Sequence, residues 1–528
     1  MSNRSRQRGF VMVLAALLIV GLMTIATVAV RRTQTLNDQS QRAYHEARVF
    51  YVAEGGADVA ADWLRNAIHI NTVPSQSDLN DFHAPTVPDY VFPQLTIAKQ
   101  PVTTTIPITQ GAYAGMNATV QPYLIVSHAA NSKGTVDQVV RVTVNREGIG
   151  MYQFGIYYDH DLEMFPAYPL DFNGRIHTNG NLYIGSSDVL NINGSVTAGG
   201  HIYNTPKDPT QYYNGKARIT DVAGHWHDLS YDSRDPNWQR KSLEDWQGRV
   251  KDVSQGTTAL AFPLSTPAFP IDVIKRGQPG DDEELRAKRY YYKAGLKIID
   301  GIATDSTGNP IALPVGVLTS SNVWDFREQK TMHMTNVNIG LLASSGMVPS
   351  NRTIYFCYTD PAGAIRLVNG ATLPAGGLSI ATENPLYVWG NFNTVNKKAC
   401  SILCDAFNVY SNNWSDGNAT KSINQRGSSA TTVNSCVVAG NTETTSGDYN
   451  GGAENLIRLH EKWVGHELTY RGSLVCIWNS QRATGDFRNA SYVEAHRDWG
   501  YDQSLLDPSL WPPDMISVQR TVRARWQG

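Results

Sequence analysis

The sequence has little charge, and outside its first eight residues it contains no basic run. Asp, Glu, Lys and Arg together make up 17% of the 528 residues, and the formal net charge is −2. A nearly neutral chain without a basic patch gives no electrostatic reason to expect a nucleic-acid partner. Low charge with abundant Gly, Asn, Ser and Thr is instead typical of a β-rich extracytoplasmic protein, and the length allows two or three domains.

Cysteine is scarce and confined to the C-terminal half. The pair Cys400-x3-Cys404 has no second close pair and no neighbouring His, so its spacing does not predict a zinc site. Export would permit disulfides, and an odd number of cysteines leaves at least one thiol free. We therefore expect one or two disulfides plus buried thiols among the five cysteines, which are Cys357, Cys400, Cys404, Cys436 and Cys476.

The common catalytic signatures are also missing. The sequence contains no Gly-x-Ser-x-Gly, no His-Glu-x-x-His and no phosphate-binding Gly loop. Glycoside hydrolysis needs two carboxylates about 5 to 10 Å apart. Asp159, Asp161 and Glu163 are candidates for such a pair, although a polar strand edge is the simpler interpretation.

Histidines offer little more. His225 and His227 would share one face of a strand, but two histidines without a defined third ligand are a weak metal signal. His177 is expected to pack in a turn, and Asp305-x-x-Gly308 falls short of a calcium loop. We expect no enzymatic activity, no cofactor and no bound metal.

A long uncharged run near the N-terminus dominates what is present. An Arg-rich leader of residues 1–9 precedes 21 residues, Phe10 to Val30, that carry no charge. As a helix this run would be about 31 Å long, which matches a bilayer core of about 30 Å. The sequence predicts a transmembrane helix over residues 10–30. A signal peptide fits less well, because the apolar core is too long and Thr27-Val28-Ala29 is a poor cleavage site. An uncleaved single-span anchor is the main alternative.

Helical periodicity continues beyond the membrane segment. Residues 31–70 form an amphipathic pattern, for which we expect a stem helix with a buried stripe of mostly small side chains. Gly55-Gly56 would weaken this helix and predicts a bend there. The stripe consists of Ala43, Ala47, Phe50, Ala57, Ala61 and Leu64.

The junction Gly9-Phe10 and the segment AYHEARVFYVAEGGADVAADWL resemble the N-terminal region of type IV minor pilins and type II secretion pseudopilins. This resemblance implies cleavage after Gly9 by a prepilin peptidase and methylation of the new terminal Phe10. It also implies a single-pass protein in the cytoplasmic membrane with its N-terminus inside. The head would be periplasmic or extracellular, and other pilin-like subunits would be partners.

The fifth residue counted from Phe10 departs from the major-pilin pattern. Major pilins usually carry Glu at that place, where it is thought to pair with a neighbouring N-terminal amine. This chain has Leu14 there. A carboxylate in lipid is costly unless it is paired, so its absence argues against the repeated fibre subunit. The resemblance then implies a minor subunit, at a filament tip or in priming.

An internal repeat carries the prediction for the rest of the fold. The segments NGRIHTNGNLYI (residues 173–184) and NGSVTAGGHIYN (residues 193–204) align at a spacing of 20 residues. Short strands broken by Gly and Asn at this period favour a parallel β-helix, with an antiparallel β-sandwich as the alternative. Strands are also expected within residues 376–393, where Ile380, Leu386 and Val388 would face a core, and within residues 401–414.

These patterns together predict an α+β protein, in which a long N-terminal transmembrane and stem helix precedes a large β-rich domain. We expect a β-rich connecting region over residues 71–150 and an exported domain over residues 151–528, with an insertion at about 205–335. Helices are expected within residues 280–295 and 453–464.

Several C-terminal segments, including GRIHTNGNLYIG, ATENPLYVWGNFN, YNGGAENLIRLHEKW and TYRGSLVCIWNSQ, resemble a large exported domain of an uncharacterised bacterial family. That resemblance implies no activity. The leading interpretation is a structural minor pilin or pseudopilin. The alternatives are an uncleaved cell-surface or periplasmic protein, and a β-helix protein that binds or degrades polysaccharide, for which Trp389 and Trp414 are candidate sugar contacts.

Overall fold

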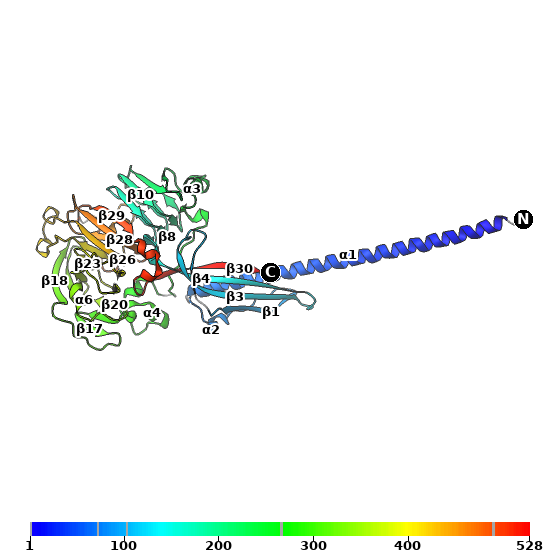
Figure 1. Cartoon of the computed structure of the whole chain (residues 1–528), viewed down its shortest axis with the longest axis horizontal. Helices are drawn as coiled ribbons and strands as arrows, with labels where there is room; N and C mark the ends of the chain where they lie inside the picture. The colour runs from blue at the N-terminus through cyan, green and yellow to red at the C-terminus, as the bar shows by residue number, and fades with distance from the viewer. Residues whose placement is uncertain (1–2, 71–72, 102–103, 265–267, 488–491) are drawn as a thin grey trace.

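The computed structural model places a β-rich head at one end of a long N-terminal helix (Figure 1). It describes residues 3–70, 73–101, 104–264, 268–487 and 492–528. The combination of a long apolar helix and a large β-rich domain with several sheets agrees with the predicted α+β class.

Helix α1 (Asn3–Ile70) is uninterrupted over 68 residues. It runs through Gly55 and Gly56, so the predicted weak point does not end the helix. Threonines within the apolar run satisfy their hydroxyls locally: Thr24 donates to the carbonyl of Val20 at 2.8 Å, and Thr27 to that of Met23 at 2.7 Å. These bonds let polar side chains sit in an apolar segment without an unpaired donor.

The C-terminal part of α1 packs on an antiparallel sheet, called here the stem sheet. Its strand order is β1-β3-β4-β30, and β2 pairs with β3. The last strand, β30, comes from the C-terminal end of the chain and pairs with β4, so the stem sheet is not built from residues 71–150 alone. The bounds are β1 Tyr90–Lys99, β2 Thr104–Pro107, β3 Asn117–Asn131, β4 Asp137–Gly150 and β30 Ser517–Gln527.

A short helix, α2 (Gln76–Leu79), covers the free edge of β1. The side-chain amide of Gln76 donates to the carbonyl of Ile97 at 3.0 Å and accepts from the backbone N–H of Lys99 at 3.0 Å. Gln76 thereby imitates a neighbouring strand, which protects an edge that would otherwise be open to pairing.

Most strands of the head belong to one long sheet, called here the large sheet, and most of its ladders are parallel. Both of its faces are buried along the central strands, which explains their continuous apolar sequences. Its strands are β5 Ile156–Tyr158, β7 Leu170–Asn173, β8 Ile176–Thr178, β10 Val189–Asn193, β11 Val196–Ala198, β13 Lys216–Thr220, β14 Trp226–Asp228, β15 Val250–Lys251, β16 Leu296–Ile299, β17 Ile302–Asp305, β20 Thr353–Cys357, β22 Leu378–Thr382, β24 Cys400–Cys404, β26 Thr431–Ala439, β28 Glu467–Cys476 and β29 His496–Tyr501.

A second sheet, called here the outer sheet, has the order β18-β19-β21-β23-β25-β27. The principal core includes residues of both sheets, among them Ile380, Leu386 and Val388, which are buried as predicted. The bounds are β18 Leu318–Asp325, β19 Lys330–Asn338, β21 Gly363–Val368, β23 Leu386–Trp389, β25 Phe407–Tyr410 and β27 Ile457–Leu459.

The two copies of the 20-residue repeat stack on each other in parallel. Asn173 pairs with Asn193, Ile176 with Val196, and Leu182 with Ile202. The last pair belongs to a small sheet of β6 (Leu162–Met164), β9 (Leu182–Ile184) and β12 (Ile202–Tyr203). The sheets of the head do not close around an axis, so the parallel β-helix stays a prediction.

The interval 205–335 mixes strands of the large and outer sheets with helices. The helix expected within residues 280–295 is present as α4 (Glu283–Lys288) and α5 (Tyr290–Lys293), and α3 (Trp238–Trp246) precedes them. Helix α6 (Ile339–Ser344) follows β19. The structure does not test the predicted domain boundaries, which stay predictions.

Two expectations are wrong. Residues 453–464 do not form an α-helix: a short 3-10 turn, Ala453–Asn455, leads into β27, whose parallel pairing with β25 overrides the local helical pattern. All five cysteines are free and buried, so the expected disulfides are absent from the residues that the structure describes. The thiols fill the cores on the two faces of the large sheet instead.

Candidate functional site: the projecting helix and its anchor

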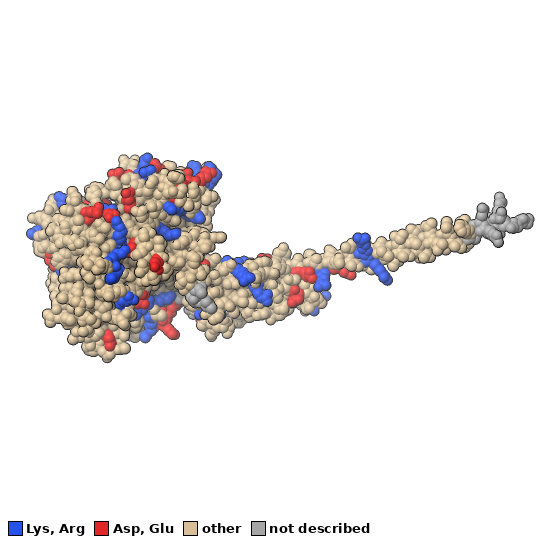
Figure 2. Space-filling model, in the orientation of Figure 1, with Lys and Arg blue, Asp and Glu red and all other residues tan. Residues whose placement is uncertain are grey.

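The N-terminal part of α1 projects away from the head without covering contacts (Figure 1). Among the described residues, one helix is long and apolar enough to cross a membrane, and its apolar window is fully exposed. Figure 2 shows this part of the helix as an uncharged shaft, and the first basic side chains beyond the apolar run are those of Arg31 and Arg32. A fully exposed apolar shaft needs lipid or partner helices around it.

The residues predicted for processing and assembly lie on this shaft. Gly9 and Phe10 fall within α1, and the Phe10 side chain is 71% exposed. Leu14, one turn further along, is 54% exposed. No contact in the head occupies either side chain, so both are open to whatever surrounds the helix.

The anchored part of α1 begins at Val49. Its buried face consists of Val49, Ala53, Ala57, Ala60, Ala61, Leu64 and Ile68, which pack against apolar side chains of the stem sheet. Of the predicted stripe, Ala57, Ala61 and Leu64 are buried, Phe50 is half-buried, and Ala43 and Ala47 are exposed. The stripe is shorter than predicted because the covering sheet begins only near Phe50.

The C-terminal strand holds the helix from one side. The rings of Trp526 and Phe50 meet edge to face with centroids 5.9 Å apart. Arg523 forms an ion pair with Asp58, and the side-chain amide of Gln519 donates to the carbonyl of Ile68 at 3.3 Å. Arg520 pairs with Glu147 of β4 at 2.8 Å. The three contacts with α1 fall at Phe50, Asp58 and Ile68, so β30 holds the helix over several turns.

Two of the three candidate hydrolase carboxylates, Asp159 and Asp161, accept hydrogen bonds from the first copy of the 20-residue repeat. Asp159 accepts from Nδ2 of Asn179 at 2.6 Å, and Asp161 accepts from the backbone N–H of Asn181 at 2.8 Å. Lys207 also reaches Asp161, at 3.0 Å. Burial raises the pKa of both Asp159 and Glu163. The contacts of the two aspartates join segments that lie 20 residues apart in the sequence and stack in parallel, which is a structural use of these groups.

His225, which directly precedes β14, and His227 on β14 converge on one carboxylate. Nδ1 of His225 lies 3.1 Å and Nε2 of His227 lies 3.5 Å from Oδ2 of Asp221. Burial works against ionisation of Asp221, but hydrogen bonds from His225 and His227 lower its pKa to about 2. Within the described residues, no group of three or more His, Cys, Asp or Glu side chains is arranged to hold a metal ion.

His177 and the two candidate sugar-binding tryptophans have different surroundings. His177 is fully buried, contacts Thr197 at 2.8 Å, and has its pKa lowered by burial to about 4. Trp414 is buried and stacks on Tyr410 with ring centroids 3.9 Å apart. Trp389 is only half-buried.

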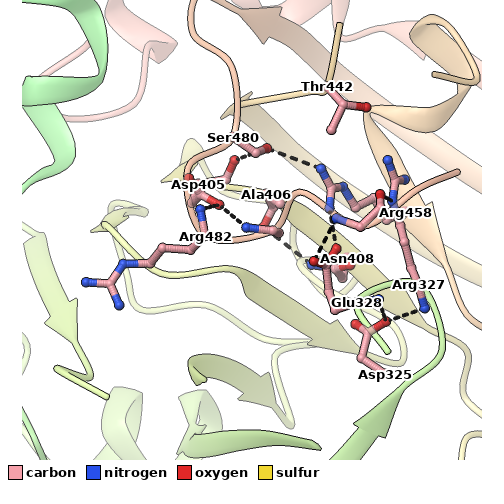
Figure 3. A network of polar contacts seen from close by, with 12 residues as sticks. Asp325, Arg327, Glu328, Asp405, Ala406, Asn408, Thr442, Arg458, Ser480 and Arg482 are labelled. Carbon is pink, nitrogen blue, oxygen red and sulfur yellow. Dashed lines mark hydrogen bonds and ion pairs between the residues drawn. The ribbon is translucent and has the colours of Figure 1, made fainter. Parts of the chain in front are cut away.

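A buried ionic network near the hairpin between β18 and β19 was not foreseen (Figure 3). Nη1 of Arg458 lies 3.1 Å from Oε1 of Glu328, and its Nη2 donates to Ser480 at 3.2 Å. Burial, reinforced by the positive charge of Arg458, lowers the pKa of Arg327 to about 9. The network ties this hairpin to β27 and to the segment around Ser480, which makes it a brace between distant parts of the chain.

No family model and no curated protein matches the sequence. Among solved structures, the chain is similar to the competence-associated pilin ComZ from Thermus thermophilus, with 11% sequence identity and a TM-score of 0.26. The alignment covers 92% of this chain and 97% of that chain. A TM-score this low carries no argument about fold or function, so the interpretation rests on the helix and its anchor.

Proposed function

We propose that this chain is a structural minor pilin or pseudopilin-like subunit of a type IV pilus or type II secretion-like apparatus. One observation carries the proposal: α1 is divided into an exposed apolar shaft and an anchored stem, and the Gly9-Phe10 junction stands at the start of the shaft. Outside a membrane such a helix needs another apolar surface to cover it, and packing against helices of the same kind would supply one.

The proposal assigns each part of the chain a place. The prepilin peptidase cuts after Gly9 at the cytoplasmic face, Phe10 becomes the methylated N-terminus, and the shaft spans the cytoplasmic membrane. The head, whose parallel ladders are proposed to be rungs of a β-helix, lies outside. Leu14 in place of a carboxylate suits a low-copy subunit at a tip or in priming. The role is structural, without catalysis or a cofactor.

Mass spectrometry of the membrane-extracted protein tests this assignment. We expect a mature N-terminus at Phe10, carrying a methyl group, in cells with an active prepilin peptidase. Gly9→Ala should be poorly cleaved, because the family's peptidase strongly prefers Gly there. Gly21→Ala is the matched control, since the space around Gly21 is open, and it should be processed normally. An intact Met1 or Ser2 terminus would contradict the proposal and leave an uncleaved single-span protein.

A further inference from the structure

A polar groove of about 620 Å³ opens on the face of the outer sheet turned away from the core, near the ends of β19, β21 and β23. Its lining includes Thr319, Asn336, Arg366, Trp389, Asn391 and Asn412. Figure 1 shows β18 and β23 on the side of the head opposite the projecting helix, so the groove lies far from the membrane segment. Neither the shaft nor the stem uses this surface.

Trp389 supplies the aromatic wall of the groove, and Arg366 fixes it in place. The Arg366 guanidinium carbon lies 4.7 Å from the centroid of the Trp389 ring. The same guanidinium donates to Asn336 at 2.8 Å and to both carboxylate oxygens of Asp416 at 2.6 and 2.9 Å. A half-buried indole held rigidly in this way offers a contact surface that loses little entropy on binding.

The groove carries no net side-chain charge. Arg366 is the only charged residue in its described lining, and the bidentate pair with Asp416 cancels that charge. A site built for phosphate or a carboxylated polymer would leave a cation free to meet its ligand. The lining therefore fits a neutral ligand.

Amide groups provide the hydrogen-bonding side of the groove. The backbone N–H of Asn391 donates to Oδ1 of Asn412 at 2.8 Å, and Nδ2 of Asn412 donates back to Oδ1 of Asn391 at 3.0 Å. This reciprocal pair holds the exposed side-chain amide of Asn391 in one orientation. Among the described residues, none accepts a hydrogen bond from Nδ2 of Asn391.

We propose that this groove binds a neutral oligosaccharide. A fixed indole face beside ordered amides and hydroxyls matches a ligand with apolar C–H faces and many hydroxyl groups. The groove volume of about 620 Å³ exceeds what a single sugar fills and suits a short oligosaccharide. The proposal is independent of the proposed structural role, because the groove would work in the same way on an uncleaved anchor.

Binding of hexasaccharides to the full chain tests this proposal. The protein should be solubilised in a detergent without a sugar headgroup, since maltoside headgroups would compete for the site. Cellohexaose, laminarihexaose, maltohexaose and chitohexaose are titrated by calorimetry, with hexagalacturonate as the anionic comparison. We expect at least one neutral hexasaccharide to bind. Trp389→Ala should then weaken binding by at least about tenfold, whereas Trp389→Phe should retain most of it.

Trp226→Ala is the matched control, because Trp226 is an exposed tryptophan of β14 outside the groove, and it should bind as the wild type does. Thermal unfolding establishes whether each variant is folded. If Trp389→Ala does not fold, Asn391→Ala replaces it in the test, because Asn391 is at an exposed position. The same weakening of hexasaccharide binding is then expected of Asn391→Ala. The proposal is overturned if no neutral hexasaccharide binds, if a folded groove variant binds normally, or if hexagalacturonate binds better through Trp389.

Discussion

Gly56 of α1 lies directly against the ring of Phe92 on β1. A methyl group placed on Gly56 would stand 2.5 Å from Cε1 of Phe92 and 2.8 Å from Oγ of Ser127. Its neighbour Gly55 has nothing within 4 Å of the same position. The two adjacent glycines therefore differ in role. The lack of a side chain at Gly56, and not at Gly55, allows the helix to approach the sheet closely.

This difference predicts opposite effects of two equivalent substitutions. Gly55→Ala should stabilise the protein by up to about 1 kcal/mol, because Ala favours a helix over Gly. Gly56→Ala gains the same propensity but forces the Phe92 ring aside, and we expect a net loss of about 1 to 3 kcal/mol. Thermal unfolding of the two variants measures the contrast. Equal stabilisation by both substitutions would mean that the Phe92 ring moves aside without an energetic cost.

Replacement of Leu14 tests the assembly argument. The wild-type protein should occur at low stoichiometry in purified filaments and should not polymerise alone. Leu14→Glu restores the carboxylate that fibre-forming subunits offer to a neighbouring amine, so its abundance in filaments should rise while the circular dichroism of the head stays unchanged. Leu18→Glu, equally exposed one turn further on, is the control and should not raise incorporation. Wild-type abundance comparable to the main subunit, measured by quantitative proteomics, would refute the argument.

Stability should fall as the pH rises from about 4.5 to about 7. Burial raises the pKa of Glu461 to about 7, although the Ser411 hydroxyl and amide favour its ionised form. Glu454, also buried, shows the same shift. The folded state then holds protons that the unfolded state has released, so the free energy of unfolding decreases through this window.

The variant Glu461→Gln should reduce that slope, with a gain on the order of 1 to 3 kcal/mol relative to wild type above pH 7. Denaturant unfolding at a series of pH values measures the effect. Glu467→Gln changes an exposed carboxylate at the start of β28 and should keep the wild-type slope. If Glu461→Gln follows the wild-type curve, Glu461 does not titrate in this range.

The five thiols should be chemically silent in the folded protein. All are buried, and burial raises the pKa of Cys400 and Cys476 to about 12, so the reactive thiolate is scarce at neutral pH. Iodoacetamide should add nothing to the native protein and five groups after unfolding in guanidinium chloride without a reductant. Fewer than five additions in the unfolded protein would reveal a disulfide.

Local patterns predicted the elements that form from neighbouring residues. The apolar run anticipates the shaft of α1, and the alignment of residues 173–184 with 193–204 anticipates the parallel register of β7 with β10 and β8 with β11. Leu456, Leu459 and Trp463 have helical spacing, which led to the prediction of a helix at residues 453–464. The prediction is wrong because backbone pairing with β25 decides the conformation there.

Contacts between distant segments were beyond sequence reasoning. Arg458 and Glu328 are separated by 130 residues, and nothing around either side chain indicates the other. The groove on the outer sheet also depends on residues that are far apart in the sequence. The sequence indicated Trp389 as a candidate sugar contact, but Arg366 and Asn412 lie beside it only because three separate strands align. The basic, weakly patterned β30 likewise gave no sign that it would join a sheet near the N-terminus.

The position of β30 joins an early segment of the chain to a much later one. Gln519 on this strand accepts a hydrogen bond from Arg146, which is 373 residues away in the sequence. Its side-chain amide also donates to the stem of α1. The stem of α1 is therefore made long before β30, the strand that completes the sheet on which the stem packs. A product terminated before Ser517 would keep helix α1 but lack the edge strand of the stem sheet. The fold thus makes the synthesis of β30 a condition for a complete stem sheet.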